Sequence, residues 1–499
     1  MTKHLDIDTK AMRAKILDLA IRGKLTDQRQ EDGNARDLLK EIQAEKERLI
    51  KEKKIKKEKP LSEITEEEKP FDIPENWEWV RLGDICSKVV DGDHNPPKGS
   101  NRPTPYIMVS SQNINNDRLV NLCRVRYLSK EVFEKENLRT LASEGDIFFT
   151  SVGSLGRSCI YDGSLNICFQ RSVSVITAQI YNWYLKRCLD SPYFQNMIYA
   201  EAKGTAQKGF YLKQLSNSLI PLPPLNEQHR IADKVSTFFA QLDAIDKAYE
   251  EYRELQQAMK AKLLDLAIQG KLTDQREEDG NAQDLLKEIQ AEKEKLIKEK
   301  KIKKEKPLLE IEADEIPFAI PNNWKWVRFG DIANYRKGPF GSSLTKAMFV
   351  PKSNNTVKVY EQKNAIQKDA SLGNYYISYD YYKQSMQSFT VSPGDIIVSC
   401  AGTIGEAYIL PSDIEVGIIN QALMRVRNYQ GIKKDYFLIC FSYAITHGAH
   451  KGQGTAIKNI PPFSILKKMM FPLPPLAEQK RIVAKLDELL PHLNPGKEP

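Results

Sequence analysis

The amino-acid sequence predicts an α+β protein in which two α/β domains are joined by two long antiparallel coiled-coil helices. The first observation is an internal repeat: residues 11–61 recur at 258–308, and only six of the 51 aligned pairs differ. The second is a pair of dissimilar stretches of similar length, roughly 86–220 and 333–471, which follow the repeats. The third is a long helical segment that follows the first variable stretch and whose apolar residues have coiled-coil spacing. This order of constant and variable blocks is typical of a duplicated frame that carries two different tips.

The bulk properties narrow the class of protein. The 499 residues suffice for about three domains of roughly 100–200 residues each. A formal net charge of +8 agrees with a nucleic-acid partner but does not require one. The seven cysteines are scattered and form no C-x-x-C, which favours reduced thiols over disulfides or a zinc site. Because the chain opens on polar residues and has no apolar run of about 18 residues, we expect no signal peptide, no membrane span and a cytoplasmic location.

The chain begins with a constant helical region, which we assign to residues 1–61. Its second half carries a charge run, EKERLIKEKKIKKEKP (45–60), which recurs at 292–307. Apolar residues such as Leu39 and Ile42 give this region a helical stripe. Two interpretations stay open: contacts to phosphates, or a solvated helix that ends in a basic linker. The interleaved glutamates favour the solvated helix.

Each variable domain opens with the motif W-x-W. The motif begins at Trp77 in the first domain, predicted for residues 62–220, and at Trp324 in the second, predicted for residues 309–471. Residues i and i+2 lie on one face of a strand. We interpret the tryptophans as core residues of an entry strand, with stacking on bases as the less favoured alternative.

The two variable domains share weak landmarks that predict one fold used twice with divergent loops. Ser129 and Ser378 each precede a predicted helix and are placed to act as its N-cap. Gly145 and Gly394 each begin a Gly-Asp-Ile turn that leads into an apolar strand. A common fold with different loops is expected where two domains differ in specificity.

The central constant region, predicted for residues 221–308, begins with a long helix over 226–270. Its apolar residues are spaced 4, 3, 4, 3, 4 and 3 apart, which is the a/d alternation of a coiled coil. At about 1.5 Å per residue the helix would be roughly 65 Å long, and Gly270 would cap its end. A polar helix of this length needs a partner that buries the seam. The predicted seam consists of Ile231, Val235, Phe238, Leu242, Ile245, Tyr249 and Tyr252.

The two chain ends together supply that partner. Ile482, Leu486 and Leu489, in a predicted C-terminal constant helix over 472–499, match the first three seam positions. The central copy spans 33 residues, and the last 23 and first 11 residues of the chain add up to 34. We therefore predict a cyclic duplication with a pseudo-twofold axis, in which the N-terminal region and the C-terminal helix complete the second long helix. An ordinary tandem duplication with independent halves is the alternative.

The loops of the variable domains carry side chains suited to DNA. Arginine and lysine can bind guanine and asparagine and glutamine can bind adenine in the major groove, while small polar residues suit phosphate oxygens. Any one of these residues is also explained as an ordinary exposed loop group, so the prediction depends on their clustering in both domains. The candidates in the first domain are His94, Lys98, Arg102, Ser111, Gln112, Asn113, Arg157, Gln170, Arg171, Lys203, Thr205, Gln207 and Lys208. Those in the second are Arg336, Lys337, Ser342, Ser343, Gln362, Lys363, Thr403, Asn420, Gln421, Lys451, Gln453, Thr455 and Lys458.

The sequence lacks the motifs of common catalytic and cofactor sites. It contains no G-x-x-x-x-G-K-[ST] loop, no dinucleotide-binding glycine fingerprint and no H-E-x-x-H. A partial match to the Asn-Pro-Pro-aromatic motif of adenine methyltransferases places Lys98 where an aromatic residue would stack on a flipped base. We predict a non-enzymatic chain without a metal site. The alternatives are a self-contained adenine methyltransferase or nuclease, and a coiled-coil adaptor that binds DNA without sequence preference.

The order of these blocks resembles the specificity subunit of type I restriction–modification systems. The likeness covers essentially the whole chain and is carried by ILDLAIRGKL and LLDLAIQGKL, PENWEWVRLGDI, DGDHNPP, GPFGSSL, and PLPPLNEQHRI with PLPPLAEQKRI. The resemblance implies that residues 62–220 and 309–471 are target-recognition domains. Each would lie in a major groove and read one half of a split, asymmetric target in double-stranded DNA. The paired helices would then fix the unread spacer, with the half-sites about one turn, roughly 10 bp, apart.

The same resemblance implies the partners of the chain. Two methyltransferase subunits would methylate adenine from S-adenosylmethionine, and restriction/translocase subunits would use ATP and magnesium. These cofactors belong to the partner subunits, so we expect none in this chain. The two constant copies are unusually alike for the family, which suggests recent duplication or recombination.

Overall fold

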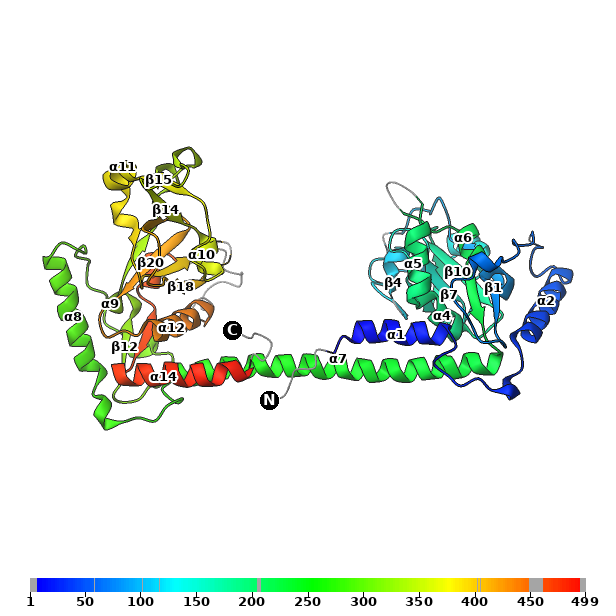
Figure 1. Ribbon diagram of the computed structural model, residues 1–499, viewed down its shortest axis with the longest axis horizontal. Coiled ribbons are helices and arrows are strands. Elements are labelled where there is room, and N and C mark those ends of the chain that lie inside the picture. Colours follow the sequence, from blue (N-terminus) through cyan, green and yellow to red (C-terminus); the bar gives the residue numbers. More distant parts are fainter. Residues whose placement is uncertain are drawn as a thin grey trace. The chain divides into compact units, whose positions relative to one another are not determined.

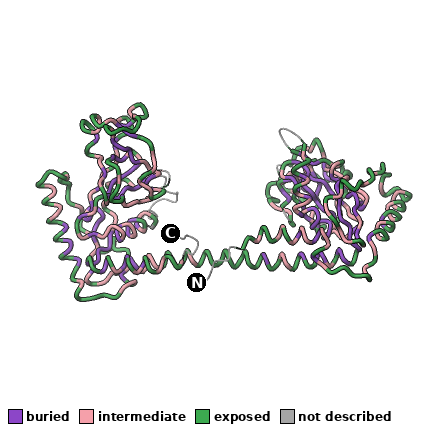
Figure 2. The backbone as a smooth tube through the Cα atoms, in the orientation of Figure 1, coloured by how far each residue is buried: buried purple, intermediate pink, exposed green. Residues whose placement is uncertain are grey.

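The computed structural model describes residues 7–57, 59–100, 102–115, 117–203, 208–401, 403, 405–447 and 461–493. The chain divides into two compact units, unit 1 ending at Glu250 and unit 2 beginning at Glu251. Figure 1 shows that each unit contains sheets together with helices, and Figure 2 shows buried residues gathered inside each unit. The predicted mixture of helix and strand is therefore confirmed.

The helical part of unit 1 consists of α1 (Thr9–Ile21), α2 (Ala35–Lys51) and the first part of α7 (Leu225–Ile268). Thr9 Oγ1 donates to Asp246 Oδ1 over 2.7 Å, and further along Thr26 Oγ1 donates to Glu227 Oε1 over 3.0 Å. From the first contact to the second, the chain advances from Thr9 to Thr26 while its partner on α7 moves back from Asp246 to Glu227. Helix α1 therefore runs antiparallel to α7 within unit 1, as Figure 1 shows.

The predicted seam of α7 is buried over only part of its length. Ile231 and Val235 are fully buried, Leu242 is 4% exposed and Phe238 is half-buried. In contrast, three seam residues are exposed, beginning next to Asp246, which binds Thr9 at the start of α1. These are Ile245, Tyr249 and Tyr252, which are 37, 36 and 43% exposed. A continuous coiled-coil seam therefore stays a prediction for this middle segment.

The helical part of unit 2 consists of the end of α7, α8 (Ala282–Lys298) and α14 (Leu476–Leu489). Ile482 and Leu486 are buried in the same core as Ile268, and Leu489 is half-buried. Helix α7 ends at Ile268, and the φ of +68° at Gly270 lets the Lys271 N–H reach the carbonyl of Leu266 at 2.9 Å. The predicted glycine cap is thus confirmed.

Three sheets form the α/β part of unit 1. The first pairs β1 (Glu78–Arg81) with β11 (Leu219–Leu222), and the second has the order β2 (Cys86–Asp91), β10 (Val173–Ala178), β7 (Ile147–Thr150), β8 (Ser158–Ile160). The third has the order β6 (Arg126–Tyr127), β3 (Tyr106–Val109), β9 (Asn166–Phe169), and a small hairpin joins β4 (Ile114–Asn115) to β5 (Arg118–Leu119). The helices are α3 (Lys130–Thr140), α4 (Asn182–Asp190), α5 (Pro192–Glu201) and α6 (Leu212–Asn217).

Unit 2 repeats this arrangement. Its two-stranded sheet pairs β12 (Lys325–Arg328) with β21 (Met470–Leu473), and its central sheet has the order β13 (Ala333–Lys337), β20 (Leu423–Asn428), β17 (Ile396–Ser399), β18 (Ala407–Ile409). The next sheet has the order β15 (Tyr376–Ser378), β14 (Thr356–Tyr360), β19 (Gly417–Ile419), β16 (Thr390–Val391). The helices are α9 (Phe329–Ile332), α10 (Gln362–Ile366), α11 (Tyr379–Tyr381), α12 (Lys434–His447) and α13 (Phe463–Leu466).

The strand registers make the two domains comparable residue by residue. Val175 lies opposite Val90 in the β10–β2 pair, and Arg425 lies opposite Arg336 in the β20–β13 pair. Both central sheets have the same strand order. The prediction of one fold used twice is therefore confirmed. Strands β11 and β21 extend across the boundaries predicted at residues 220 and 471, because their last residues still pair with β1 and β12.

The local signals of the sequence have the expected structures. Ser129 Oγ accepts a hydrogen bond from the Val132 N–H at the start of α3, and Ser378 does the same for Tyr381 at the start of α11. Trp77 and Trp324 are 3 and 5% exposed and belong to the two cores. Trp79 in β1 is 6% exposed, so three of the four tryptophans of the W-x-W motifs are core residues as predicted, whereas Trp326 in β12 is half-buried.

The repeated charge runs extend past the ends of two matching helices. α2 ends at Lys51 and α8 at Lys298, and Lys53 and Lys300 then adopt left-handed φ angles of 57° and 56°. The apolar stripe of α2 is anchored by Ile42, which is 4% exposed. A helix with a buried stripe and an exposed basic end agrees with the solvated-helix interpretation, and contacts to phosphates stay a prediction.

Candidate nucleic-acid interface

In unit 1, loops that are far apart in the sequence meet at one edge of the domain. The loop after β2 joins the turn after β9, because Asp93 N–H donates to the Phe169 carbonyl and Arg171 N–H donates to the Asp93 carbonyl, each over 2.8 Å. Gln170 N–H donates to the Val109 carbonyl at the end of β3 over 2.9 Å. The structure therefore brings the predicted segments around His94 and Gln170 together.

Two further segments join the same edge through Ser172. Ser151 N–H donates to the Ser172 carbonyl over 2.9 Å, and Ser111 N–H donates to the Ser172 hydroxyl over 3.1 Å. The Phe210 N–H donates to the Ser151 carbonyl over 2.8 Å, which attaches the segment that contains Lys203 and Lys208. Five loop segments thus share one hydrogen-bonded base in unit 1.

A glycine makes this convergence possible. Gly92 lies so close to the turn after β9 that a Cβ atom would come within 3.0 Å of the carbonyl oxygens of Phe169 and Gln170. Its N–H donates to the Val173 carbonyl over 3.0 Å. Only a residue without a side chain fits this contact. The sequence showed Gly92 within DGDHNPP, but the need for glycine there depends on a distant turn.

The loops of unit 2 converge in the same way. Gly338 occupies the position of Gly92, and a Cβ atom on it would come within 3.0 Å of the Asn420 carbonyl oxygen. Asn420 N–H donates to the Tyr360 carbonyl over 3.0 Å, and Gln362 Nε2 donates to the Ser399 hydroxyl over 3.2 Å. The segments that contain Arg336, Gln362 and Asn420 therefore form one edge.

Of the 20 predicted DNA-binding residues that the structure describes, 12 are exposed and six are half-buried. In unit 1 the exposed candidates are His94, Lys98, Arg102, Gln112, Arg157, Arg171, Lys203 and Lys208, and Gln170 is half-buried. In unit 2 Lys337, Ser342, Thr403 and Gln421 are exposed, and Arg336, Ser343, Gln362, Lys363 and Asn420 are half-buried. Thr205, Gln207, Lys451, Gln453, Thr455 and Lys458 lie outside the described residues.

Two candidates of unit 1 are buried, which revises their proposed role. Asn113 is 2% exposed, and its amide accepts from the Ser110 N–H over 3.1 Å and donates to the Asn121 carbonyl over 3.2 Å. Asn364 makes the equivalent bonds in unit 2. Ser111 is 8% exposed. Because the polar groups of Asn113 are occupied within the chain, it builds the turn that presents Gln112 rather than facing DNA itself.

The imidazole ring of His94 is held in place by a contact with a nearby carboxylate. Its Nε2 lies 2.8 Å from Asp91 Oδ2, and the other carboxylate oxygen of Asp91 lies 2.5 Å from Arg139 Nη2. The imidazole therefore projects from a loop whose side-chain orientation is set by an ion pair. Among the residues that the structure describes, no group of three or more histidine, cysteine, aspartate or glutamate side chains could hold a metal ion, and this includes the surroundings of His94.

Unit 2 carries a pair of arginines where unit 1 has two valines. Arg336 stacks on the Phe389 ring and donates to the Ser388 hydroxyl over 2.8 Å, and Arg425 donates to the Thr390 carbonyl. Burial lowers the pKa of Arg425 to about 10. Asp395, the nearby carboxylate, is already bound by both ends of the Arg427 guanidinium. This part of the sheet therefore carries buried positive charge opposite Arg336, and no local pattern in the sequence marked Arg425.

A buried glutamate fastens each domain to its helix. Trp77 Nε1 donates to Glu227 Oε2 over 2.8 Å, and Gln28 Nε2 and Thr26 Oγ1 donate to Oε1 over 2.6 and 3.0 Å. Burial raises the pKa of Glu227 above its usual value, although these three donors act against that shift. Next to it, Arg230 Nη1 lies 2.7 Å from Asp32 Oδ1.

Unit 2 contains the same fastening. Glu478 accepts from Trp324 Nε1 over 2.7 Å and from Gln275 Nε2 over 2.6 Å, and Arg481 pairs with Asp279. The following residue, Gln479, accepts from the Lys433 N–H over 2.8 Å. Both copies of the repeated E-Q-x-R motif therefore bind the domain to the helix that carries the motif, α7 in unit 1 and α14 in unit 2. Its exact recurrence was the signal available in the sequence, but its role required the structure.

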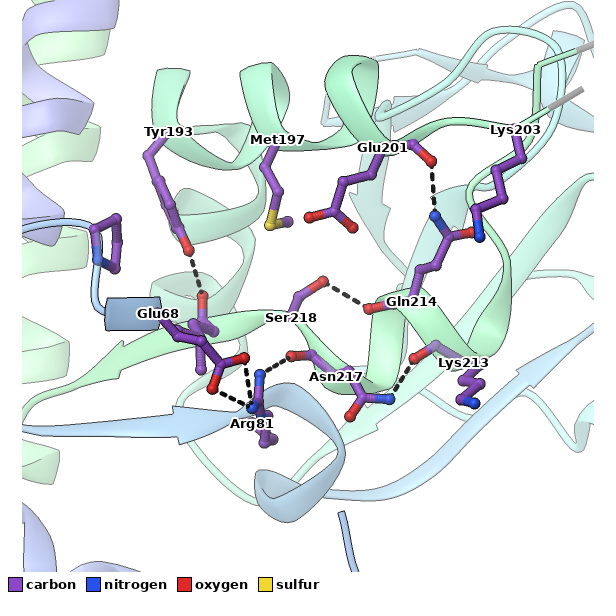
Figure 3. Close-up of a pocket in the computed structure, with 12 residues that line it drawn as sticks. Glu68, Arg81, Tyr193, Met197, Glu201, Lys203, Lys213, Gln214, Asn217 and Ser218 are labelled. Atoms are coloured by element: carbon purple, nitrogen blue, oxygen red, sulfur yellow. Dashed lines mark hydrogen bonds and ion pairs between the residues drawn. The ribbon is translucent and has the colours of Figure 1, made fainter. Parts of the chain in front are cut away.

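A recess in unit 1 is lined by residues of β1, α5 and α6 and adjoins the Lys203 segment of the loop edge. Figure 3 shows Arg81 at its floor, bound to Glu68 and to the Asn217 carbonyl. Arg81 also donates to the Ser62 carbonyl over 3.2 Å. The recess has a volume of about 550 Å³, and Lys203 lies at its rim. Because the donors of Arg81 are engaged by the chain, this arginine holds the segment before β1 in place.

The cysteines and the helices of the chain can be compared with what the sequence predicted for disulfides and membrane spans. All seven cysteines are free, and burial raises the pKa of Cys86 to about 12, so its thiol stays protonated at neutral pH. Among the described residues, no helix has the length and apolar character needed to cross a bilayer.

Two domains of one topology, each with polar loops gathered at one edge and each fastened to a helix, define a two-domain recognition protein. Residues 74–252 and 321–497 both match the model of the type I restriction modification DNA specificity domain. The chain belongs to this family. As a specificity subunit of a type I restriction–modification system, it is a non-catalytic component, and the alternatives of an enzyme or a nonspecific adaptor are not favoured.

Individual relatives agree with this family. The chain is 29% identical over 547 aligned residues to the specificity subunit of the type I restriction enzyme EcoAI from Escherichia coli, covering 97% of this chain and 89% of that protein. It is 26% identical to the EcoEI specificity subunit from Escherichia coli, with 96 and 88% covered. A chain solved in work on complex assembly and conformational transition of the type I R-M system is 19% identical, covers 85% of this chain and 93% of its own length, and has a TM-score of 0.53. This last likeness concerns the fold alone.

Proposed function

We propose that the chain recognises a split, asymmetric target in double-stranded DNA, with the domain over 62–220 reading one half and the domain over 309–471 reading the other. The observation that carries the proposal is the matched pair of loop edges, built on Gly92 and Gly338. Each edge has the same scaffold but a different set of exposed side chains. Two scaffolds of one shape with unlike side chains suit two unlike half-sites.

The exposed side chains of the edges have the chemistry of base and phosphate contacts. Arg157 and Arg171 in unit 1 and Lys337 in unit 2 supply positive charge, and Gln112 and Gln421 supply amides. Guanidinium and amide groups distinguish guanine and adenine in the major groove, whereas lysines mainly hold phosphates. Asn113 and Ser111 are left out of the contact set because they are buried.

The helical arms would set the distance between the two half-sites and assemble the complex. In unit 1, α1 packs antiparallel on α7, and in unit 2 the end of α7 shares a core with α14. We infer a pseudo-twofold, cyclic frame from these matching junctions and from the repeat. Two methyltransferase subunits would bind this frame and methylate adenine, and restriction subunits would join them. S-adenosylmethionine, ATP and magnesium would be used by those partners.

A methylome tests the proposal. The partner methyltransferase subunit is expressed with and without this chain, and modified adenines are mapped by single-molecule sequencing. We expect a split motif with an unread gap only when the chain is present. Absence of such a motif despite a stable complex would refute the proposal.

Two variants assign the parts of the motif. Replacing residues 333–471 with the variable region of another specificity subunit should change one half of the motif and leave the other half. Inserting one helical turn between residues 240 and 260 should change the length of the gap and neither half-site. A change in both halves after the replacement would contradict independent reading by the two domains.

A further inference from the structure

An aromatic side chain stands exposed at the loop edge of unit 2. Phe340 is 86% exposed, the largest fraction for any large hydrophobic side chain among the described residues. Isolated apolar residues on a protein surface are common and need no explanation by themselves. The position of Phe340 is unusual because the loop on both sides of it is tightly held.

Both flanks of Phe340 are pinned to the domain. On one side the Gly338 N–H donates to the Leu423 carbonyl over 3.0 Å, and its Cα packs against the Asn420 carbonyl. On the other side Tyr381 Oη donates to the Ser343 carbonyl over 2.6 Å, and Leu344 is only 3% exposed. The chain therefore holds the phenyl ring in solvent at a defined place instead of letting it fold onto the core.

The equivalent position in unit 1 also carries a ring. Lys337 lies opposite Met424, and Asp91 lies opposite Ser174, so the strand registers align Phe340 with His94. His94 is tied back to the carboxylate of Asp91 at 2.8 Å. Phe340 has no hydrogen-bonding group that could be tied in this way. The two domains thus present different rings, one polar and one apolar, from the same point of the scaffold.

We propose that Phe340 is a specificity-determining residue whose ring contacts the methyl group of a thymine in the half-site read by unit 2. A phenyl ring has no group that pairs with a phosphate, so its partner on DNA is an apolar surface. The C5-methyl group of thymine is the apolar group that base pairs present in the major groove. The Asn420–Gln421 turn packs against Gly338, two residues before Phe340, and Gln421 is exposed there. This inference rests on the proposed function.

The first test compares methylomes of the complex with the wild-type chain and with Phe340→Ala. We expect the substitution to relax the requirement for thymine at one position of one half-site, with the other half-site and the gap unchanged. Leu309→Ala is the matched control, because Leu309 is also apolar and 75% exposed but lies before β12, away from the loop edge. The control should leave the whole motif unchanged.

The second test measures binding of the complex to duplexes in which single thymines of that half-site are replaced by uracil, which removes only the methyl group. At one position the wild-type complex should bind about fourfold more weakly, as expected for one buried methyl group. The Phe340→Ala complex should bind both duplexes equally. Because Phe340 is exposed, an unchanged melting temperature would show that the variant is folded.

The possible failures are distinguishable. If the wild-type chain yields no split motif, the proposed function fails and this inference fails with it. If the wild-type motif appears and Phe340→Ala reproduces it, with the same response to uracil, only the role of Phe340 is refuted. An even loss of methylation over all sites would also refute base reading, and a fluorescence increase at a 2-aminopurine probe that depends on Phe340 would indicate insertion between bases instead.

Discussion

Replacing Glu227 with alanine should loosen unit 1 and leave unit 2 intact. The carboxylate is fully buried and accepts from Trp77 Nε1, Gln28 Nε2 and Thr26 Oγ1 at 2.8, 2.6 and 3.0 Å. A hydrogen bond to a charged group contributes about 1.5–3 kcal/mol, and an orphaned buried donor costs about 1–3 kcal/mol. The indole N–H of Trp77 would be orphaned, whereas Thr26 and Gln28 can regain water because they are less buried.

These contributions add up to a loss of about 3 kcal/mol, because the desolvation of the buried carboxylate offsets part of the gain from its three bonds. Hydrogen exchange measured by mass spectrometry is the suitable assay, since it reports local opening in a chain of several domains. Peptides covering 77–81 and 225–235 should exchange about a hundredfold faster in Glu227→Ala. Peptides covering 324–328 and 476–486 serve as the internal reference and should be unchanged.

The matched variants sharpen this prediction. Glu478→Ala should reverse the pattern, because Glu478 makes the equivalent bonds to Trp324 and Gln275 in unit 2. Glu227→Gln keeps the volume of the side chain and one acceptor oxygen, so its effect should be smaller than that of alanine. Unchanged exchange in the unit 1 peptides, or equal acceleration in both units, would refute the idea that Glu227 fastens its own domain.

The same residue predicts a dependence on pH. Burial raises the pKa of Glu227 above 4.5, its usual value. The folded state therefore binds the proton more tightly than the unfolded state, so the contribution of Glu227 to stability is fully present below pH 4.5 and is lost as pH rises through the folded pKa. Glu227→Gln removes this contribution. The difference between the wild-type and Gln stability curves of unit 1 should decline above pH 4.5, and a rising difference would contradict the assignment.

Two further substitutions test the loop edge of unit 2. Gly338→Ala should weaken recognition of the half-site read by this unit, because the added Cβ would collide with the Asn420 carbonyl and cost about 1–3 kcal/mol of strain. Gly341→Ala is the control, because nothing lies within 4 Å of its added Cβ. Equal motifs for both variants would argue against the close contact at Gly338. Arg425→Val, which installs the residue type of Val175 in unit 1, should leave the melting temperature unchanged or raise it, because it removes a buried guanidinium without a carboxylate of its own among the described residues. A marked fall in melting temperature would show that the bond to the Thr390 carbonyl outweighs the desolvation.

The candidate site illustrates which residues a sequence can reveal. Arg157 and Gln421 were expected from their residue type in polar loops, and the structure places both in exposed positions on the edges. Asn113 has the same chemistry, but its amide is occupied by the Ser110 N–H and the Asn121 carbonyl. Residue type alone could not separate these cases, because burial depends on how the loop folds onto its neighbours. The contacts of all these residues with DNA stay predictions.

The sequence by itself determined the features that depend on neighbouring residues. The repeat, the caps at Ser129 and Gly270 and the burial of Trp77 could all be read from local patterns, since capping and side-chain alternation act over a few residues. Only the tertiary structure decided which distant segments meet. The approach of Gly338 to Asn420 and the burial of Glu227 against Trp77 join residues 82 and 150 positions apart. Such contacts arise from the packing of whole strands and helices, which no short stretch of sequence specifies.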